Sequence, residues 1–166
     1  MSEAMQALLE ARETRWLRRK DLSRRGALLT LTMNVPGADK NPLRWNEAHR
    51  KVTAELQIIL QKGLLRLERQ ETPAGAESNF VTELSGRELK KIAVRLEEEH
   101  PIGRLLDADV MEIGGEPIGR EDLALPPRRC LCCDRQAKMC ARGRRHSLEE
   151  LFGAAEALLD SWRGLC

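Results

Sequence analysis

Residues 27–35 read Ala-Leu-Leu-Thr-Leu-Thr-Met-Asn-Val, a short apolar run that contains β-branched residues. A run of this length and composition is typical of a buried β-strand. Pro36-Gly37 follows directly and gives the signal of a turn. On both sides of the run, apolar residues recur at helical spacing instead. The stretch therefore predicts a strand between two helices, and a fold that mixes both kinds of element.

The other elements follow from periodicity and from turn residues. We expect helices over residues 1–25, 43–62, 85–100 and 147–163, and further strands over residues 64–70, 79–84, 104–113 and 116–120. A capping-box pattern begins the last two helices, at Ser85 and Ser147. We expect a loop at residues 72–77. The order favours an α+β fold with one domain over residues 1–166, in which a mixed sheet is flanked by helices. That domain includes the Cys-rich basic segment 126–146 and the C-terminal helix 147–163.

Composition excludes several classes of protein. The chain has 166 residues, of which 42% are hydrophobic and 33% charged, a balance that supports a core and argues against disorder. No apolar run approaches the roughly 20 residues that cross a bilayer. The first 16 residues lack the apolar stretch of a signal peptide. We expect a soluble, cytoplasmic protein with no membrane partner.

Basic residues gather in one segment, although the formal net charge is only +2. Between positions 128 and 145 a single acid, Asp134, is accompanied by Arg128, Arg129, Arg135, Lys138, Arg142, Arg144 and Arg145. Such a local field attracts phosphates or the acidic surface of a partner protein. A solvated basic loop has the same composition, so both interpretations stay open on this evidence.

The best catalytic candidate is the run Gly103-Arg104-Leu105-Leu106-Asp107-Ala108-Asp109-Val110. On a strand, Asp107 and Asp109 share a face, with Cα atoms about 6.5 Å apart. Such a pair can hold Mg²⁺ for phosphoryl transfer. Gly103 would permit close approach of a phosphate to the backbone. The alternative is an exposed strand face that carries two acids by chance.

A second candidate site lies among the cysteines, four of which fall between positions 130 and 140. Cys130, Cys133, Cys140 and His146 offer three thiolates and an imidazole, which is a chemically sensible tetrahedral Zn²⁺ set. Four protein ligands leave no open position, so such an ion would be structural. Cys132 could replace a neighbour. The alternative is a group of reduced, partly buried cysteines.

A third candidate is the loop after the first strand, where Gly37 and Lys40 could contact phosphate through a backbone N–H and an ammonium group. An ordinary Pro-Gly turn explains the same residues.

Three stretches together resemble a known family. They are His100-Pro101-Ile102-Gly103-Arg104-Leu105-Leu106-Asp107-Ala108-Asp109-Val110, Pro126-Pro127-Arg128-Arg129-Cys130-Leu131-Cys132-Cys133, and Cys140-Ala141-Arg142-Gly143 with His146. The chain is similar here to the apo-citrate lyase phosphoribosyl-dephospho-CoA transferases, or holo-citrate lyase synthases. The match is close over residues 95–160, and Pro36-Gly37 and Lys40 fit the family pattern more loosely.

The resemblance implies a transfer reaction. The donor would be 2′-(5″-triphosphoribosyl)-3′-dephospho-CoA, and the acceptor a serine of the acyl carrier (gamma) subunit of citrate lyase. Asp107 and Asp109 would carry Mg²⁺. Arg104 and the basic residues Arg128, Arg129 and Arg142 would hold the donor or the leaving pyrophosphate. The acids suggest a nucleotidyltransferase-like fold by analogy, although the expected Gly-Ser or Gly-Gly some ten residues upstream is missing.

Three other functions compete with this one. The equivalent maturation enzyme of malonate decarboxylase would use the same donor with another carrier protein. A non-catalytic assembly partner of the lyase is a second alternative. The Cys/His segment could also be a zinc module that binds nucleic acid. The basic segment contains no aromatic residue on which bases could stack, so we expect no nucleic-acid partner.

Overall fold

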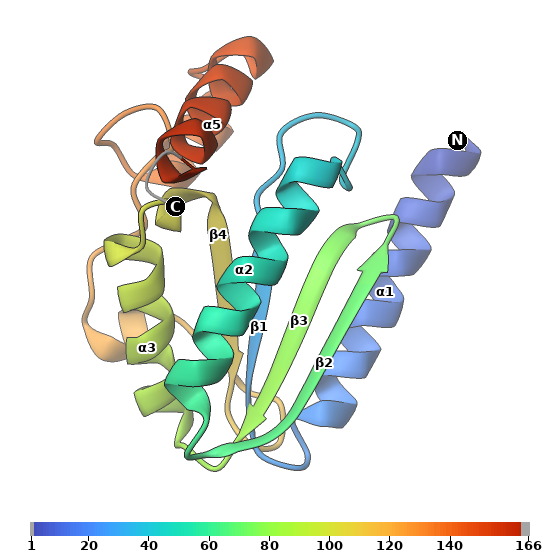
Figure 1. The fold of residues 1–166 in the computed structure, drawn as a ribbon, viewed down its shortest axis with the longest axis vertical. Helices are drawn as coiled ribbons and strands as arrows, with labels where there is room; N and C mark the ends of the chain where they lie inside the picture. The colour runs from blue at the N-terminus through green and yellow to red at the C-terminus, as the bar shows by residue number, and fades with distance from the viewer. Residues whose placement is uncertain (1, 164–166) are drawn as a thin grey trace.

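The computed structural model describes residues 2–163, which form one antiparallel sheet with helices on both faces (Figure 1). The helices are α1 (Glu3–Leu22), α2 (Leu43–Leu60), α3 (Gly86–Glu99), α4 (Ala137–Arg142) and α5 (Leu148–Arg163). The strands are β1 (Ala27–Met33), β2 (Leu64–Thr72), β3 (Gly75–Thr82), β4 (Leu106–Met111) and β5 (Pro117–Ile118). Short 3₁₀ turns occupy Gly103–Leu105 and Glu121–Leu123. The predicted α+β class is confirmed.

The strand predicted from residues 27–35, β1, lies at the centre of the sheet. The strand order is β2-β3-β1-β4-β5, and β1 pairs with both β3 and β4. Every pairing is antiparallel, so the sheet is antiparallel rather than mixed. Because side chains alternate along a strand, β1 directs Leu29 and Leu31 to one face, and Leu28, Thr30 and Thr32 to the other.

One face of the sheet carries the main hydrophobic core. Leu29 of β1 lies in register with Phe80 of β3 and Val110 of β4, and all three are buried. Helices α2 and α3 cover this face through their own buried apolar residues, and α5 adds Leu159. In Figure 1, α2 crosses in front of β1, whereas α1 passes behind β2.

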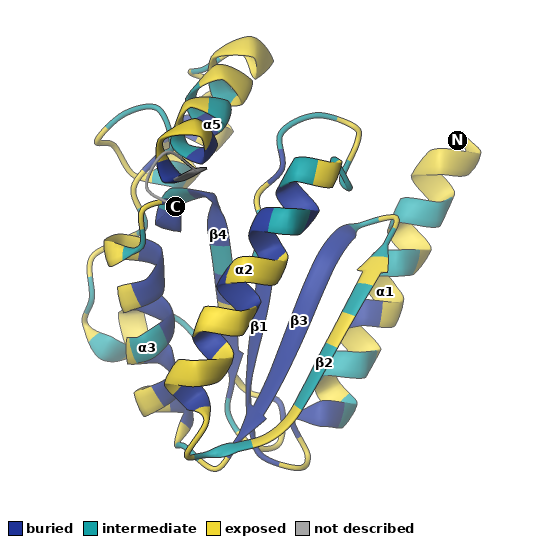
Figure 2. Ribbon diagram, viewed as in Figure 1, coloured by how far each residue is buried: buried dark blue, intermediate teal, exposed yellow. Residues whose placement is uncertain are grey.

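The opposite face is apolar at one end and polar at the other. At the apolar end, Leu22 of α1 packs with Leu28, Val81 and Met111 of the sheet. The next register rows are polar: Thr30, Asn79 and Asp109, then Thr32, Glu77 and Asp107. Figure 2 shows β3 buried along its whole length while most of α1 is exposed or half-exposed. The helix α1 therefore covers a polar layer.

The free edge of β4 is closed by side chains. The strand β5 pairs only with Val110 and Met111. At Ala108, the backbone N–H donates to the Glu97 carboxylate at 3.0 Å, and the carbonyl accepts from the Lys90 ammonium group at 3.2 Å. Two side chains of α3 thus replace a neighbouring strand at this point.

Several boundaries differ from the sequence expectations. Strand β3 begins at Gly75, so the expected loop at residues 72–77 is wrong, and only Pro73-Ala74 connects the hairpin. The expected strand at 104–113 begins at Leu106, because a 3₁₀ turn precedes it. Helix α4 was not expected. Both capping boxes are confirmed, with reciprocal bonds at Ser85 and at Ser147.

Candidate functional site

A recess of about 280 Å³ lies between α1 and the polar rows of the sheet. Its lining consists of Arg12, Arg15, Trp16, Arg19, Thr32, Asp107 and Asp109. The carboxylates come from β4, and the arginines from one face of α1. Residues spaced three and four apart share a helix face, and positions 12, 15 and 19 follow this rule. The recess therefore combines paired carboxylates with a row of cations.

The two acids point to the same side of β4, as their spacing predicts. Each has an arginine partner: Arg128 lies 3.2 Å from Asp107, and Arg19 lies 3.4 Å from Asp109. Partial burial raises the pKa of Asp107, the charge of Asp109 raises it further, and Arg128, Arg19 and Lys90 act in the opposite direction. Two like charges on adjacent sites make the protonation of Asp107 easier.

A fully buried carboxylate, Glu77, organises the arginines of α1. Arg19 donates to it at 2.9 Å, and the Arg15 guanidinium lies 3.3 Å away. Gln70 and Asn79 also donate to Glu77. Burial lowers the pKa of Arg15 and Glu77 opposes that effect. Because a buried charge needs a partner, the Glu77 carboxylate offsets the desolvation cost of holding two guanidinium groups beside the sheet.

The loop after β1 lies close to the Arg12 end of the recess. Lys40 donates to the carbonyl of Val35 at 2.7 Å, and burial together with the positive charge of Arg12 lowers its pKa. Gly37 has a positive φ of 83°, and a Cβ at this position would meet no atom within 4 Å. The structure thus brings Lys40 near the recess and leaves Gly37 at an open turn.

A second cavity, of about 360 Å³, lies on the other side of Arg128. It is lined by Glu97, Glu98, Arg104, Arg120, Pro126, Pro127, Arg128 and Arg129. Arg128 donates to the carbonyl of Arg104 at 2.8 Å while it pairs with Asp107. Arg104, Arg128 and Arg129 are therefore brought together, and Arg128 also reaches the acids.

Two residues proposed from the sequence as substrate-binding, Gly103 and Arg142, do not line the recess. Gly103 is buried in the 3₁₀ turn, where an added Cβ would lie 2.4 Å from the carbonyl oxygen of Glu97. Close packing against the end of α3 is thus sufficient to explain glycine there. Arg142 is exposed at the end of α4, and no hydrogen bond or ion pair within residues 2–163 joins it to the two acids.

The sequence reasoning missed Arg12, Arg15 and Arg19. The available signal was their spacing at i, i+3 and i+7 on one predicted helix. Arginine is ordinarily exposed, so a basic helix face is first interpreted as solvated. The buried acid that gives this face its role, Glu77, was assigned to a loop.

The cysteine cluster is brought together as its spacing suggested. The ligand atoms of Cys130, Cys133, Cys140 and His146 all lie within 4.8 Å of one another, so the group could hold a metal ion such as zinc. The backbone N–H groups of Cys132 and Cys133 and the Cys140 thiol lower the pKa of Cys130, although burial acts strongly in the opposite direction. Cys132 itself is directed to the carbonyl of Glu150 and lies outside the group. Cys166 lies outside the described residues.

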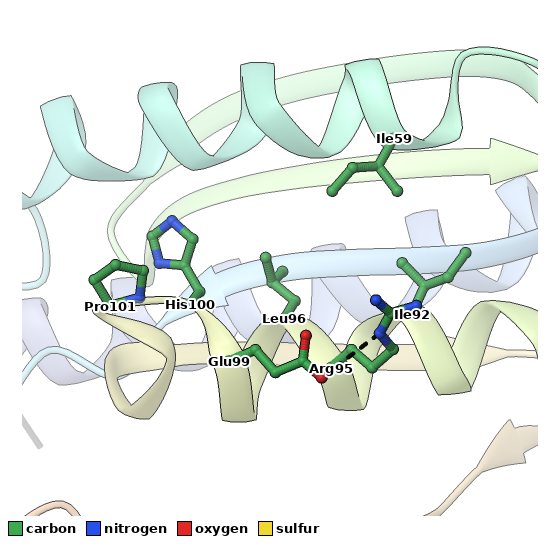
Figure 3. Close-up of a pocket in the computed structure, with 7 residues that line it drawn as sticks. All are labelled: Ile59, Ile92, Arg95, Leu96, Glu99, His100 and Pro101. Atoms are coloured by element: carbon green, nitrogen blue, oxygen red, sulfur yellow. Dashed lines mark ion pairs between the residues drawn. The ribbon is translucent and has the colours of Figure 1, made fainter.

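An apolar groove of about 390 Å³ lies elsewhere, between α2 and α3 (Figure 3). Ile59, Ile92 and Leu96 line it, and Arg95 pairs with Glu99 at its side. His100 closes one end, where it bonds to Glu55 of α2. This groove is on the core face of the sheet, whereas the two acids face α1. It offers no paired acids and is not the site that we assign.

Comparisons with known proteins agree with one another. Residues 3–162 match the family model described as apo-citrate lyase phosphoribosyl-dephospho-CoA transferase. A protein of Streptococcus pyogenes named as a probable member is 38% identical, over 93% of this chain and 84% of its own length. Proteins of Shigella boydii and Escherichia coli with the same family name are 34% identical, over 91% of this chain and 82% of theirs.

No helix within residues 2–163 is long and apolar enough to span a membrane. The family model covers nearly the whole chain, including both carboxylates of the recess and the cysteine cluster. The chain therefore belongs to the apo-citrate lyase phosphoribosyl-dephospho-CoA transferase family.

Proposed function

We propose that this protein transfers phosphoribosyl-dephospho-CoA from 2′-(5″-triphosphoribosyl)-3′-dephospho-CoA to a serine of the apo citrate lyase acyl carrier (gamma) subunit. The observation that carries the proposal is the recess, in which Asp107 and Asp109 lie below the arginines of α1. Family membership supplies the substrates, and the recess supplies groups suited to a triphosphate.

The reaction is a nucleotidyltransferase-type substitution at phosphorus. The serine hydroxyl attacks the α-phosphorus, a new P–O bond forms, and the bond between the α-phosphorus and the bridging oxygen breaks. Pyrophosphate leaves, and the hydroxyl proton passes to Asp107 or to solvent. Nothing is oxidised or reduced. Such reactions depend on positioning and on stabilisation of charge, rather than on covalent chemistry of the protein.

The arginines suit the donor because it carries several negative charges. Planar guanidinium groups bind phosphate oxygens through paired hydrogen bonds. Arg12 has no acidic partner among the described residues, and it lines the recess together with Arg19. We propose that Lys40 extends this basic surface at one end, and that the open turn at Gly37 offers a backbone N–H to phosphate. Arg128, together with Arg104 and Arg129, extends it at the other, and Arg142 is proposed to meet the acidic carrier protein or the donor.

Asp107 and Asp109 also suit a Mg²⁺ ion. This ion binds proteins through one or two carboxylates and keeps other positions for water and phosphate oxygens. Both carboxylates reach the recess, one half-exposed and the other exposed. When bound, Mg²⁺ would offset negative charge on the triphosphate. We propose that Asp107 and Asp109 hold it, and that the present arginine partners then turn to the phosphates.

The test is an intact-mass assay on the purified apo acyl carrier subunit, mixed with the triphosphoribosyl donor, Mg²⁺ and the protein. We expect a mass gain that matches the phosphoribosyl-dephospho-CoA group. Asp107→Asn and Asp109→Asn should each slow the gain by roughly 100-fold or more, since each removes a charge from the site. Chelation of Mg²⁺ should have the same effect.

The matched control is Glu83→Gln, which neutralises an exposed acid beyond the opposite end of β3. It should transfer at the wild-type rate. Full activity in both aspartate variants would keep the function and refute the site. No transfer to a competent citrate lyase carrier would refute the function, and transfer to the malonate decarboxylase carrier instead would identify that alternative.

We place the reaction in the cytoplasm. The four cysteines within the described residues are free thiols rather than disulfides, which suits a reducing compartment. The acyl carrier and the CoA-derived donor would be met there.

A further inference from the structure

The cysteine cluster joins three separate pieces of chain. Cys130 and Cys133 belong to the loop before α4, Cys140 lies on α4, and His146 follows α4. The Cys133 sulfur lies 3.5 Å from the Cys140 sulfur and 3.5 Å from Nε2 of His146. Cys130 and Cys140 are buried, and the other two ligands are partly buried.

These separations suit zinc better than other arrangements. With bonds of about 2.3 Å to sulfur and about 2.0 Å to nitrogen, neighbouring ligands of a tetrahedral zinc ion lie roughly 3.5–3.8 Å apart. A disulfide requires a separation of about 2.05 Å. Thiols that only filled a core would not need a histidine nitrogen at the same spacing.

The surrounding segment buries little apolar surface, chiefly the two buried cysteines and Leu131, which packs against the main core. Apart from the buried cysteines, residues 126–146 are exposed or half-exposed, and Met139 is 59% exposed. A short bridge between Arg129 and Gln136 is its only strand-like pairing. A loop with so little buried apolar surface is commonly fixed by a metal ion. The neighbouring basic residues also favour three thiolates around one Zn²⁺, which together carry a net negative charge.

The cluster lies two residues from Arg128, which reaches the recess. Arg104 donates to the carbonyl of Cys130 at 3.4 Å, and Arg128 donates to the carbonyl of Arg104 and pairs with Asp107. Movement of Cys130 would therefore displace the arginine that pairs with Asp107.

We propose that Cys130, Cys133, Cys140 and His146 bind one structural zinc ion that holds segment 126–146 in place and positions Arg128 beside Asp107. The metal site stands on the geometry of the cluster alone, while its effect on transfer rests on the proposed function. Arg128 is in this account a positioning and charge-pairing residue that depends on the metal.

The first measurement is the zinc content of the full chain by inductively coupled plasma mass spectrometry. The protein is purified under reducing conditions without added metal. We expect about one zinc ion per chain. Cys133→Ser should lose it. Cys132→Ser is the matched control, because it changes the adjacent thiol that points to Glu150 instead, and it should keep the ion.

A second measurement covers the case in which Cys133→Ser fails to fold. The wild-type protein is stripped with a chelator and titrated with Co²⁺, whose visible absorption reports tetrahedral thiolate ligation. Zn²⁺ should then displace Co²⁺. Absence of both zinc and Co²⁺ binding in the reduced wild-type chain would overturn the proposal, as would equal loss of metal from Cys132→Ser.

The consequence for Arg128 is measured in the transfer assay with Mg²⁺ always present. Removal of zinc should lower the transfer rate by roughly 10-fold or more, and added Zn²⁺ should restore it. A chain that binds zinc but never transfers would refute the proposed function and leave the metal site intact. Unchanged transfer by the stripped chain would overturn the positioning of Arg128.

Discussion

At the scale of single residues, Arg12 distinguishes binding of the donor from stability of the fold. It is exposed, lines the recess and has no acidic partner among the described residues. Its charge lowers the pKa values of Lys40 and Arg15, which are also positive. A cation without an acidic partner that also opposes other cations adds little to the stability of the folded chain, so binding of an anion is the role that its position suits.

Arg12→Gln should therefore weaken donor binding without loss of stability. A charge-assisted hydrogen bond contributes about 1.5–3 kcal/mol, so we expect the KM for the donor to rise roughly 10- to 100-fold. The free energy of unfolding should change little. Steady-state kinetics and thermal unfolding measure the two effects. Arg24→Gln is the control. It makes the same charge change at an exposed residue just after the C-terminal end of α1. If Arg24→Gln raised KM equally, a general field effect would replace specific binding.

At the scale of elements, α1 is attached to the sheet in two ways. Its middle is held by charges, since Arg18 bonds to Glu68 and Arg15 and Arg19 face Glu77. Its end is held by apolar packing of Leu22 against the sheet. Its large apolar residues Met5, Leu9, Trp16 and Leu17 are exposed, so charged side chains make most of its contacts with the sheet, which is unusual for a helix that covers a sheet.

The apolar end should contribute most of the stability of α1. Leu22→Ala leaves a cavity at a fully buried site and should cost about 2–5 kcal/mol in the free energy of unfolding. Leu17→Ala, on the same helix but 62% exposed, should cost less than about 0.5 kcal/mol. Urea unfolding compares them. Equal losses would mean that the helix packs differently from the structure described.

The elements also show how far a sequence can be interpreted without a structure. The short apolar run of β1 and the capping boxes predicted their elements well, because each depends on local chemistry. The start of β3 was missed because Gly75, Ala76 and Glu77 were assigned to a loop and the strand was expected to begin only at Asn79. In the folded chain the partners of Glu77 and Ser78 come from distant helices: Arg15 and Arg19 of α1 pair with Glu77, and Thr53 of α2 bonds to Ser78. Helix α4 was missed for a similar reason, since the cysteines around it meet only in the folded chain.

The candidate site divides in the same way. Asp107 and Asp109 could be paired from their spacing on one strand, and the four Cys/His ligands from their spacing in one segment. The arginines of α1 could not be assigned to the recess, because nearly ninety residues separate Arg19 from Asp109. Periodicity predicts the elements themselves, but it does not predict which distant elements contact one another.

At the scale of the whole molecule, His49 links global stability to pH. It belongs to α2 and is fully buried against β1, where its Nε2 donates to the carbonyl of Leu31 at 3.1 Å. Burial lowers the pKa of His49 to about 4, while the Leu31 bond and Glu71 act the other way and Arg69 and Arg15 add to the lowering. The imidazole is therefore neutral in the folded chain at neutral pH.

Stability should fall as the solution is made acidic. In the unfolded chain His49 takes up a proton near its ordinary pKa of about 6.5. Between that pH and about 4 the unfolded chain binds a proton that the folded chain does not. The free energy of unfolding should thus decrease across this window, by up to about 3 kcal/mol from this group.

Urea unfolding at a series of pH values measures this decrease. In His49→Gln the amide can still donate to Leu31, and the difference between wild type and variant should shrink as the pH falls. His100→Gln is the control, since it changes a histidine that bonds to Glu55 instead. Its free energy of unfolding should keep the decrease with falling pH that His49 causes in the wild type. A difference between wild type and His49→Gln that stayed constant with pH would contradict the assignment.

The closed edge of β4 has a consequence for behaviour in a crowded solution. An open strand edge invites a strand from another chain, and stacking of this kind begins many aggregates. Here the hydrogen-bonding groups of Ala108 are already occupied by Glu97 and Lys90, and those charges would have to be expelled before a foreign strand could add. The same α3 side chains that complete the sheet therefore oppose the addition of a foreign strand at this edge.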